Sequence, residues 1–301
     1  MKINKQYIGI VLSVIICVLL VFAGAYATTT VGNNVSIGGT LTVTSTMSGS
    51  NFSTNDTLFN TFVGTGVGTT TTASYNTIIG YQAGHTMDDG AADANTFIGY
   101  RAGYLNNKGD SNIGIGYEAL YTNTGVAASN IAIGLDTLYS NTEGDGNIAI
   151  GDYAMWANTT GRYNVAIQQY ALYANLSGEK NYAIGYNSLA NNVEGSYNVA
   201  LGQDTGDGQD ASNNIFVGYR AGYSASASNN TIIGYQAGYN ADGGSGVFFG
   251  YQAGYNETDA DKLYIENSNS ATPLIYGSFS DDFLIVTSKL GIGTACYYAI
   301  I

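Results

Sequence analysis

The sequence is poor in the residues that active sites and covalent cross-links need. Its 301 residues include one histidine, one proline, two cysteines and nine lysines and arginines, and only 10% are charged, against about 25% in an average domain. An enzyme needs titratable side chains that converge, and one histidine offers little for that. The sequence has nine lysines and arginines but 22 acidic residues, which gives a net charge of −13. Because a nucleic-acid groove needs clustered cations, DNA and RNA are excluded as partners.

A leader is predicted at residues 1–27. Two lysines precede an uncharged apolar run, and Ala25-Tyr26-Ala27 offers the small-x-small pattern of a signal-peptidase site. Residues 8–27 are also long enough to span a bilayer as an uncleaved anchor, which would be the chain's only contact with a membrane. Either form predicts an exported chain at an extracellular or cell-surface location. Cleavage would leave Cys296 as the one thiol, so no internal disulfide is expected.

What the sequence has instead is a repeat. A unit of the form Asn-x-x-apolar-Gly recurs twelve times within residues 57–256, with steps of 16 to 19 residues. We call its two fixed members the repeat Asn and the repeat Gly. The repeat Asn residues are Asn60, Asn76, Asn95, Asn112, Asn130, Asn147, Asn164, Asn181, Asn198, Asn214 and Asn230, with Gly246 as the exception. The repeat Gly positions are Gly64, Gly80, Gly99, Gly116, Gly134, Gly151, Gln168 in place of Gly, Gly185, Gly202, Gly218, Gly234 and Gly250.

The length of the unit predicts the fold. Sixteen to nineteen residues are too few for a helix pair or a propeller blade, and short apolar runs bounded by Gly and Asn are typical of strands. We therefore predict an all-β protein, a parallel β-solenoid of about twelve coils with two strands in each coil. One Asn per coil can stack, each side-chain amide donating to the carbonyl of the next. The repeat Gly lets the chain turn where a Cβ would collide.

Two other positions of the unit vary together. The residue two before the repeat Gly is Phe or Ile in units one to three and ten to twelve, where the residue four after it is Gly. In units four to nine the first is Gly or Ala, and the second is Leu or Met except at Gly206. Because a packed core tolerates volume-conserving exchange, we predict that the two positions are in contact. The pair Ala200 and Gly206 should then enclose the largest void.

Three units carry a resemblance to a known family. Asn147-Ile148-Ala149-Ile150-Gly151, Asn181-Tyr182-Ala183-Ile184-Gly185 and Asn198-Val199-Ala200-Leu201-Gly202 resemble the Asn-x-Val-Ala-Ile-Gly repeat of trimeric autotransporter adhesin heads of the YadA type. The resemblance covers roughly residues 60–256. It implies a left-handed β-roll, three chains side by side as a homotrimer, and display on a cell surface.

The flanking segments have separate predictions. Residues 28–56, in which apolar residues alternate, are expected to form a β-rich base or linker. Residues 257–301 form a predicted C-terminal β module, which resembles the segment that ends the shaft of phage tail-fibre and bacterial surface-fibre proteins.

No catalytic, cofactor-binding or metal-binding residue is predicted. His85 stands where other units carry an aromatic residue such as Tyr104, which makes it a substitution within the repeat. Carboxylate pairs can act on polysaccharides, but the candidate acids fall in loops rather than on a common strand face. They are Asp88 with Asp89, Asp281 with Asp282, and Asp204, Asp207 and Asp210. Loop oxygens at residues 206–210 and at Asp259 and Asp261 keep bound calcium open as an alternative.

These observations predict an exported surface fibre, an adhesin head that attaches to a host surface, matrix or glycan. Its tyrosines could bind glycans, because aromatic rings offer apolar faces and a polar tip, or they could be half-buried structure. A purely structural fibre, or a phage-type tail-fibre shaft without a ligand of its own, is the alternative. A polysaccharide-acting β-helix enzyme is the third possibility.

Overall fold

The computed structural model describes residues 59–68, 73–87, 92–208 and 210–290. The predicted leader at residues 1–27 and the predicted base or linker at residues 28–56 lie outside the described residues. The described residues form one stack of coils.

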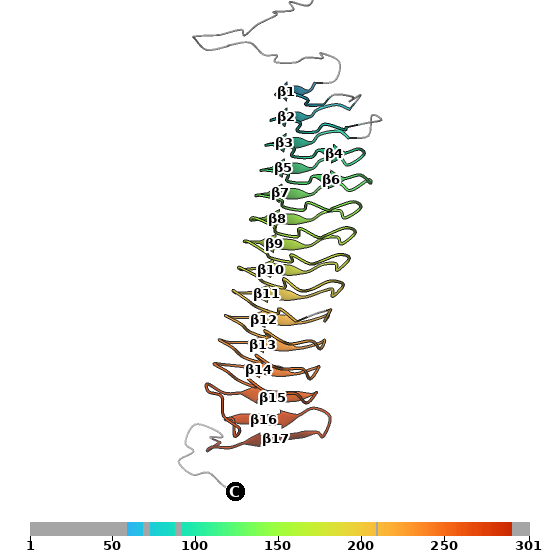
Figure 1. Cartoon of the computed structure of the whole chain (residues 1–301). Coiled ribbons are helices and arrows are strands. Elements are labelled where there is room, and N and C mark those ends of the chain that lie inside the picture. Colours follow the sequence, from blue (N-terminus) through green and yellow to red (C-terminus); the bar gives the residue numbers. More distant parts are fainter. Residues whose placement is uncertain (1–58, 69–72, 88–91, 209, 291–301) are drawn as a thin grey trace, which may run out of the picture. The chain divides into compact units, whose positions relative to one another are not determined.

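One three-residue strand per repeat unit builds the stack (Figure 1). Each strand begins after the repeat Asn position and ends before the repeat Gly position, and neighbouring coils pair in parallel in the same register. The described residues contain no helix. The predicted all-β parallel solenoid of about twelve coils is confirmed. The twelve strands are β1 (Thr61–Val63), β2 (Thr77–Ile79), β3 (Thr96–Ile98), β5 (Ile113–Ile115), β7 (Ile131–Ile133), β8 (Ile148–Ile150), β9 (Val165–Ile167), β10 (Tyr182–Ile184), β11 (Val199–Leu201), β12 (Ile215–Val217), β13 (Thr231–Ile233) and β14 (Val247–Phe249).

The sheet continues beyond the last repeat. β15 (Lys262–Ile265) pairs in parallel with β14, and β16 (Ile275–Ser278) and β17 (Phe283–Val286) then add in antiparallel order. The sheet therefore has fifteen strands. The change of direction after β15 ends the regular coil.

The prediction of two strands per coil is wrong for most coils. A second strand occurs among the described residues only as the pair β4 (Leu105–Asn106) and β6 (Thr122–Asn123). The residues two and four after the repeat Gly have positive φ in all twelve coils, as in Glu118 (+50°) and Leu120 (+53°). This left-handed backbone interrupts the extended conformation of a strand. Hydrogen bonds between coils persist, since Glu118 N donates to Tyr100 O at 2.8 Å and Leu120 N to Thr137 O at 3.0 Å.

The core is a narrow file of side chains inside the coils, and the predicted large–small contact is confirmed. A Cβ built on Gly103 would lie 2.5 Å from Cδ2 of Phe97, and one built on Gly222 would lie 2.4 Å from Cδ1 of Phe216. Both rings are fully buried. The phenylalanine rings therefore occupy the space that Leu or Met fills in the middle coils.

The predicted void beside Gly206 is filled. A Cβ on Gly206 would lie 2.4 Å from Cδ2 of Phe216 and 3.1 Å from Cδ2 of Leu189. Phe216 comes from the next coil and packs against Gly222 as well. Side-chain volume is thus balanced between neighbouring coils as well as within one coil. The predicted void was wrong because the sequence pattern pairs positions of one unit only.

Candidate functional site

The predicted repeat Asn residues form one buried column with a structural role. Oδ1 of each accepts a hydrogen bond from the backbone N–H of the equivalent residue one coil further, as between Asn147 and Asn164 at 3.0 Å. In eight of the eleven residues Nδ2 closes its own coil, as in the 2.9 Å bond from Asn147 to Gly161 O, whereas Nδ2 of Asn76 and Asn214 is buried without a partner. The column ends where Asn230 accepts the N–H of Gly246 at 2.8 Å. The predicted amide-to-amide stack is therefore mainly a stack of side chain-to-backbone bonds, and amide-to-amide bonds accompany it at a few steps, such as Asn164 to Asn147 at 3.2 Å.

A second buried asparagine column was missed. Its members follow the repeat Asn by 11 residues in six successive coils, and most of their amides donate to the Oδ1 one coil earlier, as from Asn175 to Asn158 at 2.8 Å. Each amide also donates to a carbonyl that the repeat Asn of the same coil already uses, as Asn158 does to Gly161 O at 3.1 Å. The spacing was visible in the sequence and could have revealed it. The column consists of Asn106, Asn123, Asn141, Asn158, Asn175 and Asn192.

The predicted repeat Gly residues lie where two coils approach most closely. A Cβ on Gly99 would lie 2.1 Å from the carbonyl oxygen of Gly116, and the φ of Gly99 is +143°. Both facts strongly favour glycine, since L-residues rarely adopt this backbone and a carbonyl cannot move like a flexible side chain. Gln168 holds the same position with φ +95°. The repeat Asn and repeat Gly residues are thus the scaffold of the stack.

Aromatic side chains form two columns on the segment that follows the repeat Gly. In the first aromatic column, at the residue directly after it, Tyr100 stacks on Tyr117 with centroids 4.8 Å apart. In the second aromatic column, five residues after it, His85 stacks on Tyr104 at 5.0 Å, as expected for a substitution within the repeat. That column continues through Tyr121, Tyr139, Trp156 and Tyr173, and resumes at Tyr223, Tyr239 and Tyr255. Because the rings stack on one another, most ring faces inside the columns are covered.

The outer face of the sheet carries two columns of side chains, one of them apolar throughout. The middle residue of each strand is buried in nearly every coil, so the first and third residues point outward. The third residue is apolar in all twelve coils, and examples such as Ile133, Ile150 and Ile184 are 36 to 39% exposed. The first is Ile, Val, Thr or Tyr. We call this surface the aliphatic face. A continuous apolar surface along a whole sheet is typical of a protein–protein interface.

The acidic residues that the structure describes do not converge into a reaction centre. Asp204 is buried and pairs with Arg220 at 3.3 Å. Burial raises the pKa of Asp136, and the charges of Glu118 and Asp152 raise it further. Among the described residues, no group of three His, Cys, Asp or Glu side chains is placed to hold a metal ion. Asp88 and Asp89 lie outside the described residues, and bound calcium stays a prediction.

Asp207 gives a testable pH dependence. Burial, with a contribution from the charge of Asp204, raises its pKa to about 6. The folded state therefore holds this proton more tightly than the unfolded state, and the stability this contributes is full below about pH 4 and lost as the pH rises through about 6. Asp207→Asn keeps the Oδ1 that accepts from Asn191. We expect it to stabilise the fold at pH 7 by about 1 kcal/mol, a figure discounted for solvent screening.

The measurement is the thermal midpoint of both chains between pH 4 and pH 8. The wild-type midpoint should fall relative to the variant across this window. Parallel curves would show that Asp207 titrates normally, and Asp242→Asn, at an exposed loop acid, controls for the change in net charge.

Comparison of the chain with protein-family models, with curated proteins and with solved structures gives no match. Within the part of the chain that the structure describes, no apolar helix is long enough to cross a membrane. The surfaces of the solenoid are therefore the features that bear on its function.

Proposed function

We propose that this chain is an exported surface-fibre protein, a head-like left-handed β-roll whose copies pack side by side as a homotrimer and mediate attachment. The observation that carries the proposal is the aliphatic face. Exported proteins without an internal disulfide need another source of stability, and lateral packing of copies is one. Export itself rests on the sequence of the leader.

The size of the aliphatic face suits a second copy of the chain. Fifteen strands spaced about 4.8 Å apart, each with three residues of about 3.3 Å, give a strip of roughly 650 Å². Three copies whose strips line a common axis would bury roughly 1,950 Å² in the whole trimer, comparable with the about 1,200 to 2,000 Å² of a specific interface. A partner must also present contact groups that recur at the spacing of the coils along the full length of the strip. Another copy of the same solenoid has that repeat by construction.

The mass of the chain in solution, by light scattering after size exclusion, tests the assembly. We expect three times the chain mass, and a single-chain mass for the double variant Ile133→Lys/Ile150→Lys, because two buried ammonium groups would have no partner. Leu176→Lys is the matched control: Leu176 is equally exposed, at 41%, but lies on a loop. A monomeric wild type would overturn the homotrimer, and a dimer would retain the aliphatic face but contradict the adhesin-head arrangement.

A purely structural fibre is the second candidate, and the covered ring faces of the aromatic columns favour it. Arg101 reinforces this packing, with its guanidinium 5.1 Å from the ring centre of Tyr100 and 5.3 Å from that of Tyr104. Saturable binding to a glycan array or to matrix proteins separates the two candidates. Binding supports attachment, and its absence on an assembled chain leaves a structural fibre.

A further inference from the structure

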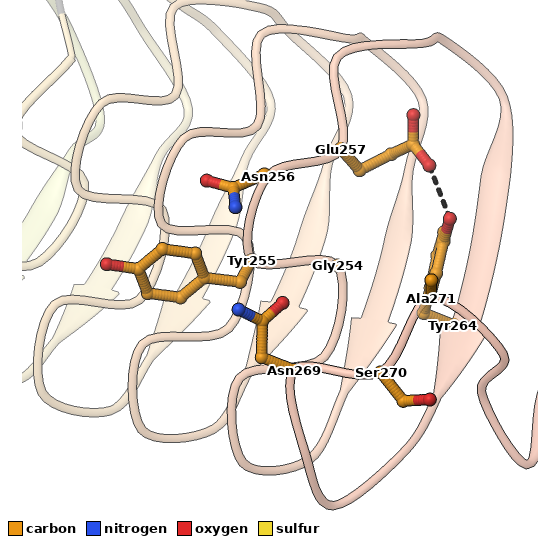
Figure 2. Close-up of a pocket in the computed structure, with 8 residues that line it drawn as sticks. All are labelled: Gly254, Tyr255, Asn256, Glu257, Tyr264, Asn269, Ser270 and Ala271. Atoms are coloured by element: carbon orange, nitrogen blue, oxygen red, sulfur yellow. Dashed lines mark hydrogen bonds between the residues drawn. The ribbon is translucent and has the colours of Figure 1, made fainter.

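A hollow of about 260 Å³ opens where the regular coil ends. After β15 the chain reverses direction, so the loop at residues 267–274 does not complete another coil. Figure 2 shows the side chains that surround the hollow. Those with chemical function are Tyr255, Asn256, Glu257, Tyr264, Asn269 and Ser270. Pockets for drug-sized ligands span about 300 to 1,000 Å³, so this volume suits a smaller ligand of about one ring.

Tyr255 supplies a ring face that the inner rings of its column lack. It is the last ring of the second aromatic column, and one of its faces stacks on Tyr239 at 5.0 Å with the planes 4° apart. No ring of the described residues stacks on its other face, and Figure 2 shows Asn269 of the loop beside Tyr255. Tyr255 also lines the hollow.

The polar groups around the hollow are mostly neutral. The side chain of Asn269 and Nδ2 of Asn256 make no hydrogen bond to any described residue, whereas Oδ1 of Asn256 accepts from Asn240 at 2.8 Å. The hydroxyl of Ser270 accepts from the backbone N–H of Thr272 at 3.0 Å and shares a hydrogen bond of 3.3 Å with the hydroxyl of Thr272. Free amides that carry both donors and acceptors match the hydroxyl groups of a sugar.

The one carboxylate is already held in place. Oε2 of Glu257 accepts from the hydroxyl of Tyr264 at 2.5 Å, and Oε1 accepts from the backbone N–H of Asp259 at 2.8 Å. Burial and this bond raise the pKa of Tyr264, so the phenol keeps its proton and continues to donate. Two donors partly satisfy the negative charge, yet each carboxylate oxygen can accept one more hydroxyl.

We propose that this hollow binds one pyranose ring of a neutral glycan. The ring stacks its C–H face on the open side of Tyr255, where it continues the aromatic column. The amides of Asn256 and Asn269 and the carboxylate of Glu257 bond its hydroxyl groups. The inference rests on the proposed attachment function and deepens it, because it names the ligand class and gives each chain one site at the end of the coil stack.

Saturation-transfer NMR on the full chain tests this, with the methyl glycosides of glucose, galactose, mannose and N-acetylglucosamine as probes. We expect transfer to the ring protons of at least one glycoside, with a Kd of about 1 mM, as one ring platform and a few hydrogen bonds allow. Asn269→Ala and Tyr255→Leu should each weaken binding about tenfold. Asn269 is exposed and unbonded, so its variant should fold normally. Tyr104→Leu is the matched control, since Tyr104 lies between His85 and Tyr121 in the same column.

Three outcomes would overturn the inference: no transfer to any glycoside, transfer that both variants leave unchanged, or stronger transfer to choline than to the sugars, which would make the hollow a cation site. Failure of the glycan-binding inference can be distinguished from failure of the proposed attachment function. A trimer that binds matrix but none of the glycosides contradicts only the inference. Glycoside binding without attachment to a glycan array or matrix contradicts only the attachment role.

Discussion

Gly116→Ala is expected to destabilise the solenoid by more than about 3 kcal/mol, or to prevent folding. The added Cβ would lie 2.2 Å from the carbonyl oxygen of Gly134 and 2.8 Å from its carbon, and the φ of Gly116 is +138°. The obstructing atoms are backbone, so the two coils would have to separate. Their separation would strain the strand pairing of β5 with β7. Chemical denaturation followed by far-ultraviolet circular dichroism measures the loss.

Two matched variants separate the steric clash between coils from the backbone strain at positive φ. Gly66→Ala also places a Cβ on a residue with positive φ (+73°), but the nearest atom is the flexible Cγ of Gln82 at 3.3 Å. It should cost only about 1 kcal/mol of backbone strain. Gln168→Gly removes a Cβ from a repeat Gly position with φ +95°. It should stabilise the chain by about 1 kcal/mol, because the relieved strain exceeds the entropy cost of a glycine. Equal losses for Gly116→Ala and Gly66→Ala would contradict the close approach of coils as the cause.

The fold could be predicted because every coil has the same sequence pattern. Each strand starts after the repeat Asn and ends before the repeat Gly, so a twelvefold spacing in the sequence specified the stacking register directly. The large–small exchange located a core contact for the same reason. A single unit, such as the one with Phe97 and Gly103, would not have shown it; the comparison among units did.

The second strand of each coil was predicted wrongly because its interruption does not require glycine. Leu120, Leu138 and Met155 adopt a left-handed backbone that such residues seldom adopt in isolation, with φ between +51° and +53°. The packing of neighbouring coils imposes this conformation, and residue type does not indicate it. The void predicted beside Gly206 was wrong for a related reason, since a ring from the next coil enters it.

The columns of side chains can be predicted from the sequence, whereas the hollow beside Tyr255 cannot. The aromatic columns and the second asparagine column follow from fixed spacings, so a fuller register analysis would find them. The hollow beside Tyr255 depends on where the chain leaves the regular coil, and on a loop in which Asn269 and Ser270 have no repeat counterpart. Only the path of the chain brings that loop to the end of the aromatic column.

The second large effect is expected for the repeat Asn column. Asn147→Leu keeps the approximate volume of the side chain but removes three hydrogen bonds. The backbone N–H of Asn164 loses its acceptor, at 3.0 Å. The amide of Asn164 loses one acceptor, at 3.2 Å, and keeps Gly178 O at 2.8 Å, and Gly161 O loses one donor, at 2.9 Å, and keeps Asn158. Asn147 and Asn164 are fully buried, so water cannot replace these partners. One unpaired buried N–H costs about 1 to 3 kcal/mol and the two other lost bonds cost less, so we expect a loss of about 2 to 4 kcal/mol in denaturant unfolding.

Position within the fold, rather than residue type, should decide the size of this effect. Asn240 forms one exposed bond, to Asn256 at 2.8 Å, and Asn240→Leu should change stability by less than about 0.5 kcal/mol. Asn158→Leu removes a donor from the same Gly161 carbonyl that Asn147 uses. The double variant of Asn147 and Asn158 should therefore deviate from additivity, because the two side chains share one acceptor. A loss for Asn147→Leu no larger than that for Asn240→Leu would mean that the stack is held by its strand pairing and apolar core, and that the asparagine column only accompanies it.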